Sequence, residues 1–225
     1  PQAMAGGGNG LMPGEVSMAC HGVLFMDEFN LFSTKTVEVL RQPMENGHIL
    51  IDRVNGKVEY PADFMLVAAM NPCKCGYYPD RNKCSCTPAQ VRAYFGKLSR
   101  PLLDRIDVCV QVPRIKYEDM VYDGKDLYTN EYMRSTVERV FNIQKERFAH
   151  EKYSLNSSIP AADVSRYCIL DGEAGNLMNS IYDSCDLSAR GYHKLLKVAR
   201  TIADIDGSEH IMAEHICEAS GYRMV

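Results

Sequence analysis

The stretch GVLFMDEFN, residues 22–30, runs four apolar side chains, Val23 to Met26, directly into two acids, Asp27 and Glu28. A short apolar run bounded by polar residues is typical of a strand inside a parallel sheet, where both faces are covered. Acids at the carboxyl end of such a strand can hold a hydrated Mg²⁺ and orient the water that attacks a nucleoside triphosphate. The alternative is a strand that simply ends in two solvated acids.

The composition is that of a soluble globular protein. Apolar residues make up 46% of the 225 residues and charged residues 24%, both ordinary values. The net charge of −4 argues against general coating of nucleic acid, although a local basic patch stays compatible with it. The sequence has no apolar run long enough for a membrane span and no charged-then-apolar leader. We therefore expect a cytoplasmic protein without a membrane partner.

Strand patterns and helix patterns alternate over residues 1–112. The predicted strands are 22–27, a hairpin at 48–60 around Asn55-Gly56, 64–71 and 107–112. The predicted helices are 33–46, between the cap Ser33 and the stop at Asn46-Gly47, and one that starts at the capping box Thr87–Gln90. This alternation predicts an α/β fold with a mostly parallel, doubly wound sheet.

Residues 130–225 carry helical patterns only. The first predicted helix has an amphipathic apolar face made of Met133, Val137, Val140, Phe141 and Phe148. The next runs from the cap Ser188 to Gly207, and a last helix covers 210–219. The sequence thus predicts a core at 1–112, a connector at 113–129 and a helical domain at 130–225.

Three further side chains could act on the same triphosphate. Asn71 ends the second apolar strand, and the carboxyl ends of parallel strands meet at one sheet edge, where its amide could position water. In LSRPLLDRID, Arg105 or Arg100 could reach a neighbouring subunit's phosphate. Arg190 opposes the helix dipole in the first turn of its helix, which phosphate contact would explain.

Each of these residues has a purely structural alternative. Asn71 precedes Pro72, as a turn-forming asparagine does. Arg105 could pair with Asp104 or Asp107, and Arg190 could be a solvated surface arginine.

Taken in order, these pieces resemble the magnesium-chelatase-like AAA+ ATPases, and most closely their bacterial competence-protein branch. The resemblance is carried by blocks spread over nearly the whole chain: GGGNGLMPGEVSMACHGVLFMDE, VLRQPMENG, FMLVAAMNPCKCGYYPD, CSCTPAQVRAYFGKLSRPLLDRID and SARGYHKLLKVARTIADIDGSEHI. It implies the C-terminal part of an AAA+ core with a β-hairpin insertion, followed by an all-helical lid. It also implies ATP and Mg²⁺ as cofactors and a homo-oligomeric ring, expected to be a hexamer.

The resemblance assigns roles residue by residue. Asp27 and Glu28 match the Walker B acids, Asn71 matches sensor 1, Arg105 matches the arginine finger and Arg190 matches sensor 2. Segments 48–60 and 5–21 match the family's two hairpin inserts. The glycine-rich lysine loop that binds phosphate, G-x-x-x-x-G-K-[ST], does not occur in the 225 residues. We expect it upstream, in a longer parent protein, and expect the chain alone to be an inactive ATPase.

Four cysteines, Cys73, Cys75, Cys84 and Cys86, form the pattern C-x-C-x8-C-x-C. Four thiolates so spaced could close a structural Zn²⁺ site; the alternatives are unligated thiols or disulfides, and a reducing cytosol disfavours disulfides. The other five cysteines lie in periodic apolar contexts and are predicted to be core residues, whereas His210 and His215 are predicted to be surface or cap residues.

The resemblance to the competence branch implies a motor that acts on DNA, in recombination or branch migration during natural transformation. At the hairpin tip Arg53 and Lys57 could touch DNA phosphates in the ring's pore; the alternative is that they only keep the hairpin soluble. Two other functions stay open. One is the ATPase subunit of a magnesium chelatase, although the cysteine cluster favours the competence branch, and the other is a catalytically inactive interaction module.

Overall fold

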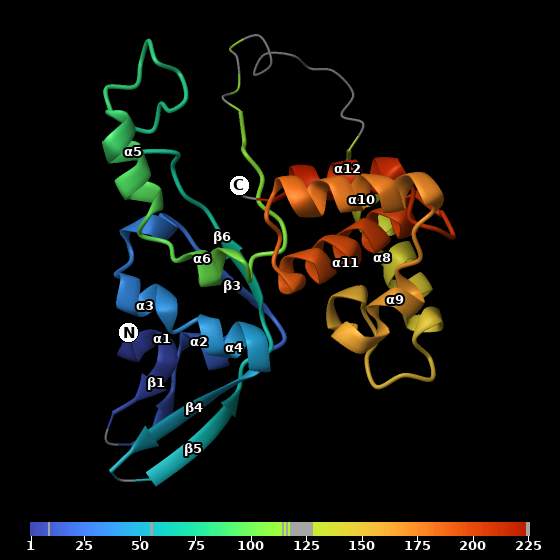
Figure 1. Cartoon of the computed structure of the whole chain (residues 1–225). Coiled ribbons are helices and arrows are strands. Elements are labelled where there is room, and N and C mark those ends of the chain that lie inside the picture. Colours follow the sequence, from blue (N-terminus) through green and yellow to red (C-terminus); the bar gives the residue numbers. More distant parts are fainter. Residues whose placement is uncertain (9, 55, 114, 116, 118–127, 224–225) are drawn as a thin grey trace. The chain divides into compact units, whose positions relative to one another are not determined.

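The computed structural model describes residues 1–8, 10–54, 56–113, 115, 117 and 128–223. The chain divides into two compact units, Pro1–Ile106 and Asp107–Val225, each of which has its own core. Figure 1 shows the helices and strands of both units. Most of the predicted connector 113–129 and the hairpin residue Asn55 lie outside the described residues. Among the described helices, none combines the length and the apolar character needed to cross a bilayer.

The N-terminal unit contains a parallel pair of strands and two antiparallel hairpins. β3 (Val23–Met26) and β6 (Met65–Ala68) run parallel, with Val23 opposite Met65 and Met26 opposite Ala68. The hairpins are β1 (Gly6–Gly7) with β2 (Met12–Pro13) and β4 (His48–Arg53) with β5 (Gly56–Pro61). The helical segments are α1 (Gln2–Ala5), α2 (Glu15–Met18), η1 (Phe29–Leu31), α3 (Thr34–Glu38), α4 (Arg41–Asn46), α5 (Pro88–Phe95) and α6 (Arg100–Leu103).

Local sequence signals place the ends of these elements as predicted. Ser33 Oγ accepts the backbone N–H of Thr36 at 3.2 Å, and Thr87 and Gln90 form both hydrogen bonds of a capping box. Gly47 ends α4 in the left-handed conformation with φ 70°. The single helix predicted for 33–46 is instead divided into α3 and α4. Pro43 has no N–H to donate to an earlier carbonyl, which accounts for the interruption.

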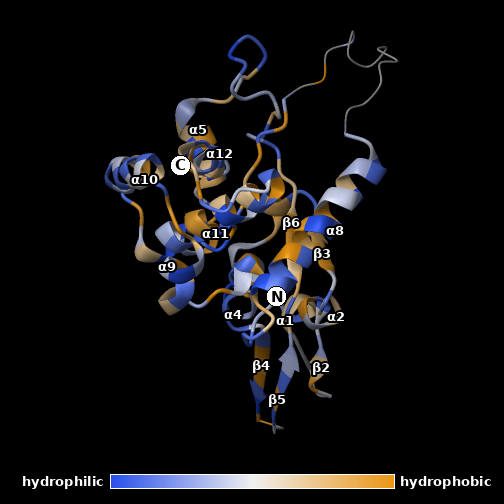
Figure 2. Ribbon diagram, turned by 90° about the vertical axis from the view of Figure 1, so that its right-hand side faces the viewer, coloured by the Kyte–Doolittle hydropathy of each residue, from blue (hydrophilic) through white to orange (hydrophobic). Residues whose placement is uncertain are grey.

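The parallel sheet is smaller and more open than predicted. Residues 107–112 form no strand, because their backbone pairs with no neighbouring strand; the N–H of Cys109 donates instead to the Tyr222 carbonyl at 2.6 Å. β3 and β6 are also covered on one face only, with exposed side chains Val23, Phe25, Met65 and Val67 on the other. The continuous apolar runs therefore predicted the two strands correctly. The prediction that both faces of these strands are buried was wrong. Figure 2 shows the apolar colour of this pair.

The two hairpins lie side by side. The Tyr60 hydroxyl of β5 donates to the Leu11 carbonyl of the glycine-rich hairpin at 2.8 Å. Gly6, with φ 91°, and Gly14 allow the backbones to approach: a Cβ on Gly14 would come within 2.6 Å of the Ala5 carbonyl carbon. Gly6 and Gly14 are thus required for close packing in segment 5–21.

The C-terminal unit is helical, as predicted. Its elements are α8 (Asn130–Arg147), η2 (Asn156–Ser158), η3 (Ala161–Asp163), α9 (Val164–Tyr167), α10 (Gly172–Ser184), α11 (Ala189–Asp206) and α12 (Ala213–Gly221). Ser188 caps α11 and Gly207 ends it, as predicted. The core gathers Leu195, Leu196, Ala199 and Ala203 of α11 with Ile211 and Ile216.

Some side chains that were predicted to be buried are exposed. On α8, Val140 and Phe148 are buried, but Met133, Val137 and Phe141 are exposed, because the helix meets its unit through only part of its apolar face. Cys168 is buried, Cys20 and Cys109 are partly buried, and Cys185, directly after α10, and Cys217 of α12 are exposed. Apolar spacing identified helix faces but not which of them are covered.

The prediction that His210 and His215 are surface or cap residues is confirmed, because His215 caps a helix and His210 lies on the surface. His215 is buried, and its Nδ1 accepts the Met212 N–H at 2.9 Å at the start of α12, whereas His210 is exposed.

Candidate functional site

The acids Asp27 and Glu28 directly follow β3 and are both exposed. Glu28 has φ 50° and ψ 43°, a left-handed conformation that is uncommon for a residue with a side chain. Its N–H donates to Asp27 Oδ1 at 2.8 Å. Strained residues of this kind cluster at functional sites, and the turn here moves the chain away from the strand direction immediately after the two carboxylates.

Asn71 lies at the same end of the parallel pair. The parallel ladder continues past the strands, since Ala69 N–H donates to the Met26 carbonyl and Phe29 N–H donates to the Ala69 carbonyl, both at 2.9 Å. Asn71 is exposed two residues beyond Ala69. The structure therefore brings the two acids and the amide to one edge of the β3–β6 pair, where ligands bind in parallel sheets.

Arg105 follows α6 and is paired within its own unit. Its Nη2 donates to a carboxylate oxygen of Glu45, at the end of α4, and its side chain is only 11% exposed. Glu45 thus accounts for part of the positioning of Arg105, for which Asp104 and Asp107 were the partners considered as a structural alternative from the sequence. Arg100, the other candidate, is exposed at the start of α6.

Arg190 belongs to the C-terminal unit. It is the second residue of α11 and is exposed, beside Ser188, whose Oγ accepts the Gly191 N–H at 3.1 Å. Arg190 and the strand-end residues belong to different units and form separate candidate sites.

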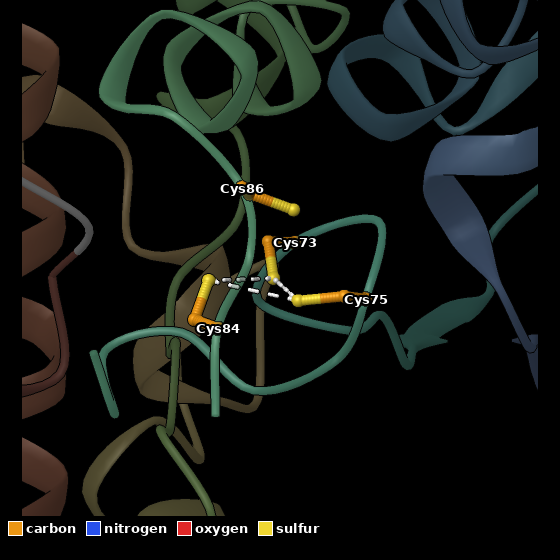
Figure 3. A group of neighbouring side chains, drawn as sticks. All are labelled: Cys73, Cys75, Cys84 and Cys86. Atoms are coloured by element: carbon orange, nitrogen blue, oxygen red, sulfur yellow. Dashed lines mark hydrogen bonds between the residues drawn. The ribbon is translucent and has the colours of Figure 1, made fainter. Parts of the chain in front are cut away.

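Cys73, Cys75, Cys84 and Cys86 come together as predicted, between β6 and α5 (Figure 3). All four Sγ atoms lie within 4.8 Å of one another, with separations of 3.3 Å for Cys73–Cys75, 3.6 Å for Cys75–Cys84 and 3.8 Å for Cys73–Cys84. Zn–S bonds of about 2.3 Å in a tetrahedron place sulfurs about 3.8 Å apart. The geometry therefore fits a four-thiolate metal site, and four ligands leave no open position.

The surroundings of the cluster give two of its thiols different pKa values. A hydrogen bond from the Tyr77 backbone lowers the pKa of Cys75 to about 6, while burial raises the pKa of Cys84 to about 11. One thiolate is thus favoured among neighbouring thiols, and binding of a divalent metal would release the remaining protons. Val91, Tyr78 and Phe95 pack against the cluster, which anchors α5 to this loop.

At the tip of the β4–β5 hairpin, Arg53 and Lys57 are both exposed, as a phosphate contact requires. Val54, between them in sequence, is fully exposed. The hairpin itself is formed as predicted, with Asp52 opposite Lys57 and Arg53 opposite Gly56.

Two polar residues of interest were missed by sequence reasoning. Glu45 is 60 residues away from Arg105, and the sequence carries no signal for a pair at that separation. Asn30 is buried next to the strand end, and among the described residues its Nδ2 has no hydrogen-bond partner. The only feature of the sequence that could have pointed to Asn30 as a functional residue is its position at the end of GVLFMDEFN.

Two family models match the chain. The model described as "Magnesium chelatase, subunit ChlI" matches residues 1–120, and the model described as "Magnesium chelatase, subunit ChlI C-terminal" matches residues 128–223. The chain belongs to the magnesium chelatase family. This confirms the family resemblance found in the sequence, and a mixed α/β unit with a parallel strand pair, followed by helices, fits part of an AAA+-like protein.

Several curated proteins are similar to this chain over nearly its whole length. "Competence protein ComM" of Haemophilus influenzae is 39% identical over 221 residues, and "Uncharacterized protein YifB" of Escherichia coli is 38% identical over 223 residues. "Magnesium-chelatase 38 kDa subunit" of Chlorobaculum parvum is 24% identical over 224 residues. These alignments cover 98%, 99% and 98% of this chain but only 42%, 43% and 56% of the relatives.

Proposed function

We propose that the chain is part of an ATP-driven ring motor that acts on DNA. The observation that carries this proposal is the meeting of Asp27, Glu28 and Asn71 at one edge of a parallel strand pair. Family membership supports an ATPase, and the similarity to a protein named for competence supports DNA as the partner. Arg53 and Lys57, both exposed at the hairpin tip, are the candidate DNA contacts in unit Pro1–Ile106.

Each residue at the strand edge has a proposed task in the full-length protein. Carboxylate oxygens are hard ligands that suit Mg²⁺, and Asp27 would hold the ion through water. Glu28 would orient and deprotonate the attacking water, and Asn71 would position that water beside the terminal phosphate. Arg190 would contact phosphate from the helical unit, which we propose to act as the lid.

Arg105 is proposed to act on ATP held by the neighbouring subunit. It would have to exchange Glu45 for phosphate oxygens, which also accept charge-assisted hydrogen bonds from a guanidinium. A cation supplied across an interface commonly gives about a thousandfold in rate. In full-length protein, Arg105→Ala and Glu28→Gln should each abolish turnover while leaving ATP binding intact.

Mixing these two variants tests the assignment directly. Mixed rings contain interfaces that pair an intact Glu28 with an intact Arg105, so ATPase activity should rise above that of either variant alone. Arg100→Ala is the matched control and should keep nearly full activity. Mixed rings that form without recovering activity would contradict action across the interface.

For the chain as it stands, we propose no useful affinity for ATP, because most binding energy for a triphosphate comes from the glycine-rich lysine loop, a motif its sequence lacks. Calorimetry with Mg-ATP should show no binding at micromolar concentrations. A micromolar dissociation constant would overturn this point.

The other candidate function is insertion of Mg²⁺ into a porphyrin, favoured by the likeness to a protein named as a magnesium-chelatase subunit. ATPase assays of the full-length protein separate the two functions. Stimulation by single-stranded or branched DNA supports the motor, whereas stimulation by a porphyrin with its partner subunits supports the chelatase. No stimulation by either and no basal hydrolysis would leave the protein an interaction module.

We also propose that the four-cysteine cluster holds one structural Zn²⁺. Elemental analysis of protein purified without added metal should give about one zinc per chain, and Cys84→Ser should lose it. Cys217→Ser removes an exposed cysteine of α12 and should leave the zinc content unchanged. Metal-free protein with all four thiols of the cluster titratable would refute the site.

A further inference from the structure

The segment that carries the cysteine cluster, residues 73–97, is strongly basic. Its only acidic residue is Asp80. Its basic residues are Lys74, Arg81, Lys83, Arg92 and Lys97. The whole chain has a net charge of −4, so this concentration of cations runs against the overall composition. A bound Zn²⁺ with four thiolates would add a net charge of −2, and the segment would still be positive.

Three exposed side chains lie within the first cysteine pair and in the loop that follows it. Lys74, Tyr77 and Lys83 are exposed, and Tyr77 has 48% of its surface in water although it is aromatic. The ion pair of Lys83 with Asp80 is 3.7 Å long between two half-exposed side chains. Such a pair is weak, so a phosphate can replace the carboxylate.

The loop is held in shape rather than left loose. The Arg81 guanidinium lies over the Tyr78 ring, 5.1 Å from its centroid, and Arg81 Nη1 donates to the Cys86 carbonyl at 3.4 Å. Backbone hydrogen bonds, Gly76 N–H to the Cys73 carbonyl at 3.0 Å and Asp80 N–H to the Tyr77 carbonyl at 2.8 Å, close two successive turns. The cations and the tyrosine are therefore presented on a fixed frame.

We propose that this surface, formed by Lys74, Tyr77, Arg81 and Lys83, binds single-stranded nucleic acid. The lysines and the arginine would contact phosphates, and the Tyr77 ring would stack on an unpaired base. Cationic surfaces with an exposed aromatic side chain bind single strands in this way. Stacking distinguishes a nucleic acid from an acidic peptide, because only the nucleic acid has bases that can stack on the Tyr77 ring. The inference builds on the proposed DNA partner and metal centre, and it adds a contact separate from the hairpin tip.

The test measures binding of a fluorescent 20-nucleotide oligo(dT) to the 225-residue chain by anisotropy, without ATP. Lys74→Ala combined with Lys83→Ala should weaken binding about tenfold or more at 50 mM salt. It should also reduce the salt slope by about 1.4, or about 0.7 per lost contact. Tyr77→Ala should weaken binding about fivefold or more with the salt slope unchanged. Lys35→Ala combined with Lys152→Ala removes the same charge from exposed sites elsewhere and should have little effect.

Several results would overturn the proposal. An equal loss in the control pair would mean general electrostatic attraction. An unchanged affinity of Tyr77→Ala, or equal competition by poly-glutamate, would mean a polyanion site without stacking. Stronger binding of duplex than of oligo(dT) would also contradict it. Zinc content and full-length ATPase activity are measured separately, so failure of the metal centre or of the motor stays distinguishable from failure here.

Discussion

At the scale of single residues, Asp204 organises the buried charge of the C-terminal unit. Its carboxylate is 1% exposed and accepts hydrogen bonds from Arg147, Arg200 and Asn156, with Arg147 Nη1 at 2.7 Å and Asn156 Nδ2 at 2.8 Å. Arg200 also donates to the Glu209 carbonyl at 2.6 Å. One buried cation, Arg200, and one partly buried cation, Arg147, therefore depend on the same anion.

Asp204→Asn should destabilise the unit strongly. The change keeps the shape but leaves two guanidinium groups without their counter-charge, and breaking a buried pair costs about 3 kcal/mol or more. Urea denaturation followed by circular dichroism measures the free energy of unfolding. Asp183→Asn, an exposed position of α10, should change it by less than about 0.5 kcal/mol. Equal stability of the two variants would show that the network contributes little.

Glu38 gives a pH-dependent contribution in the N-terminal unit. Hydrogen bonds from Ser99 and from Arg41 Nη1, the latter at 2.8 Å, lower the pKa of its carboxyl below the ordinary 4.5. A lowered folded-state pKa means that stability is fully present above the unfolded pKa, and is lost as pH falls through the folded value.

Glu38→Gln should therefore lower the free energy of unfolding at pH 7, by up to about 1 kcal/mol, and should lower it less at pH 3. Urea titrations of both proteins at the two pH values measure this change. The control Glu59→Gln, exposed on β5, should show no such difference. A destabilisation that is the same at both pH values would assign the effect to shape rather than charge.

At the scale of elements, the two hairpins of the N-terminal unit depend on glycine. Gly14→Ala places a methyl group against the backbone of Gly6 and Ala5, which cannot move without opening the β1–β2 hairpin. We expect a loss of about 1–3 kcal/mol in stability. Gly10→Ala is the matched control, because its added Cβ meets only the Met12 side chain at 3.7 Å, an ordinary contact. Thermal melts of the two variants should differ by several degrees, and identical melts would refute the packing role.

Secondary-structure elements were predictable from the sequence where interactions between residues close in sequence determine their ends or their pairing. The caps at Ser33, Thr87 and Ser188 satisfy N–H groups only three residues away. The pairing of β4 with β5 and the four-cysteine cluster likewise follow from residues close in sequence. The sequence-based prediction was wrong where the structure of a segment depends on a second segment that pairs with it or covers it. The segment 107–112 has strand-forming side chains but lacks a strand to pair with, and the outer face of α8 has apolar spacing without a covering element. The pair of Arg105 and Glu45 joins residues 60 apart, which no local pattern encodes.

At the scale of the whole molecule, the chain consists of two units whose cores are built from separate sets of residues. The core of Pro1–Ile106 gathers around Phe29, Leu40 and Leu102, whereas that of Asp107–Val225 gathers around α11. Each core is contiguous within its own stretch of sequence, as in domains that fold independently.

Residues 107–225, produced alone, should therefore fold. We expect a helical circular dichroism spectrum and a cooperative urea transition whose midpoint matches that of the same unit in the full chain. Ile211→Ala, which removes a fully buried side chain, should shift that midpoint down through a loss of about 2–5 kcal/mol. A non-cooperative transition of the wild-type unit would show that its core needs the other half of the chain.

The open face of the β3–β6 pair affects how this protein behaves in solution. Phe25 and Met65 have 62% and 64% of their surface in water, beside Val23 and Val67. Clustered apolar surface drives chains to associate, and sulfate strengthens such association because it is excluded from protein surfaces. The apparent mass of the chain will therefore rise with protein concentration and with ammonium sulfate even without nucleotide. Light scattering measures the apparent mass of Phe25→Ser and of the wild type under the same conditions. A lower apparent mass of the variant would distinguish association through this apolar face from ring assembly.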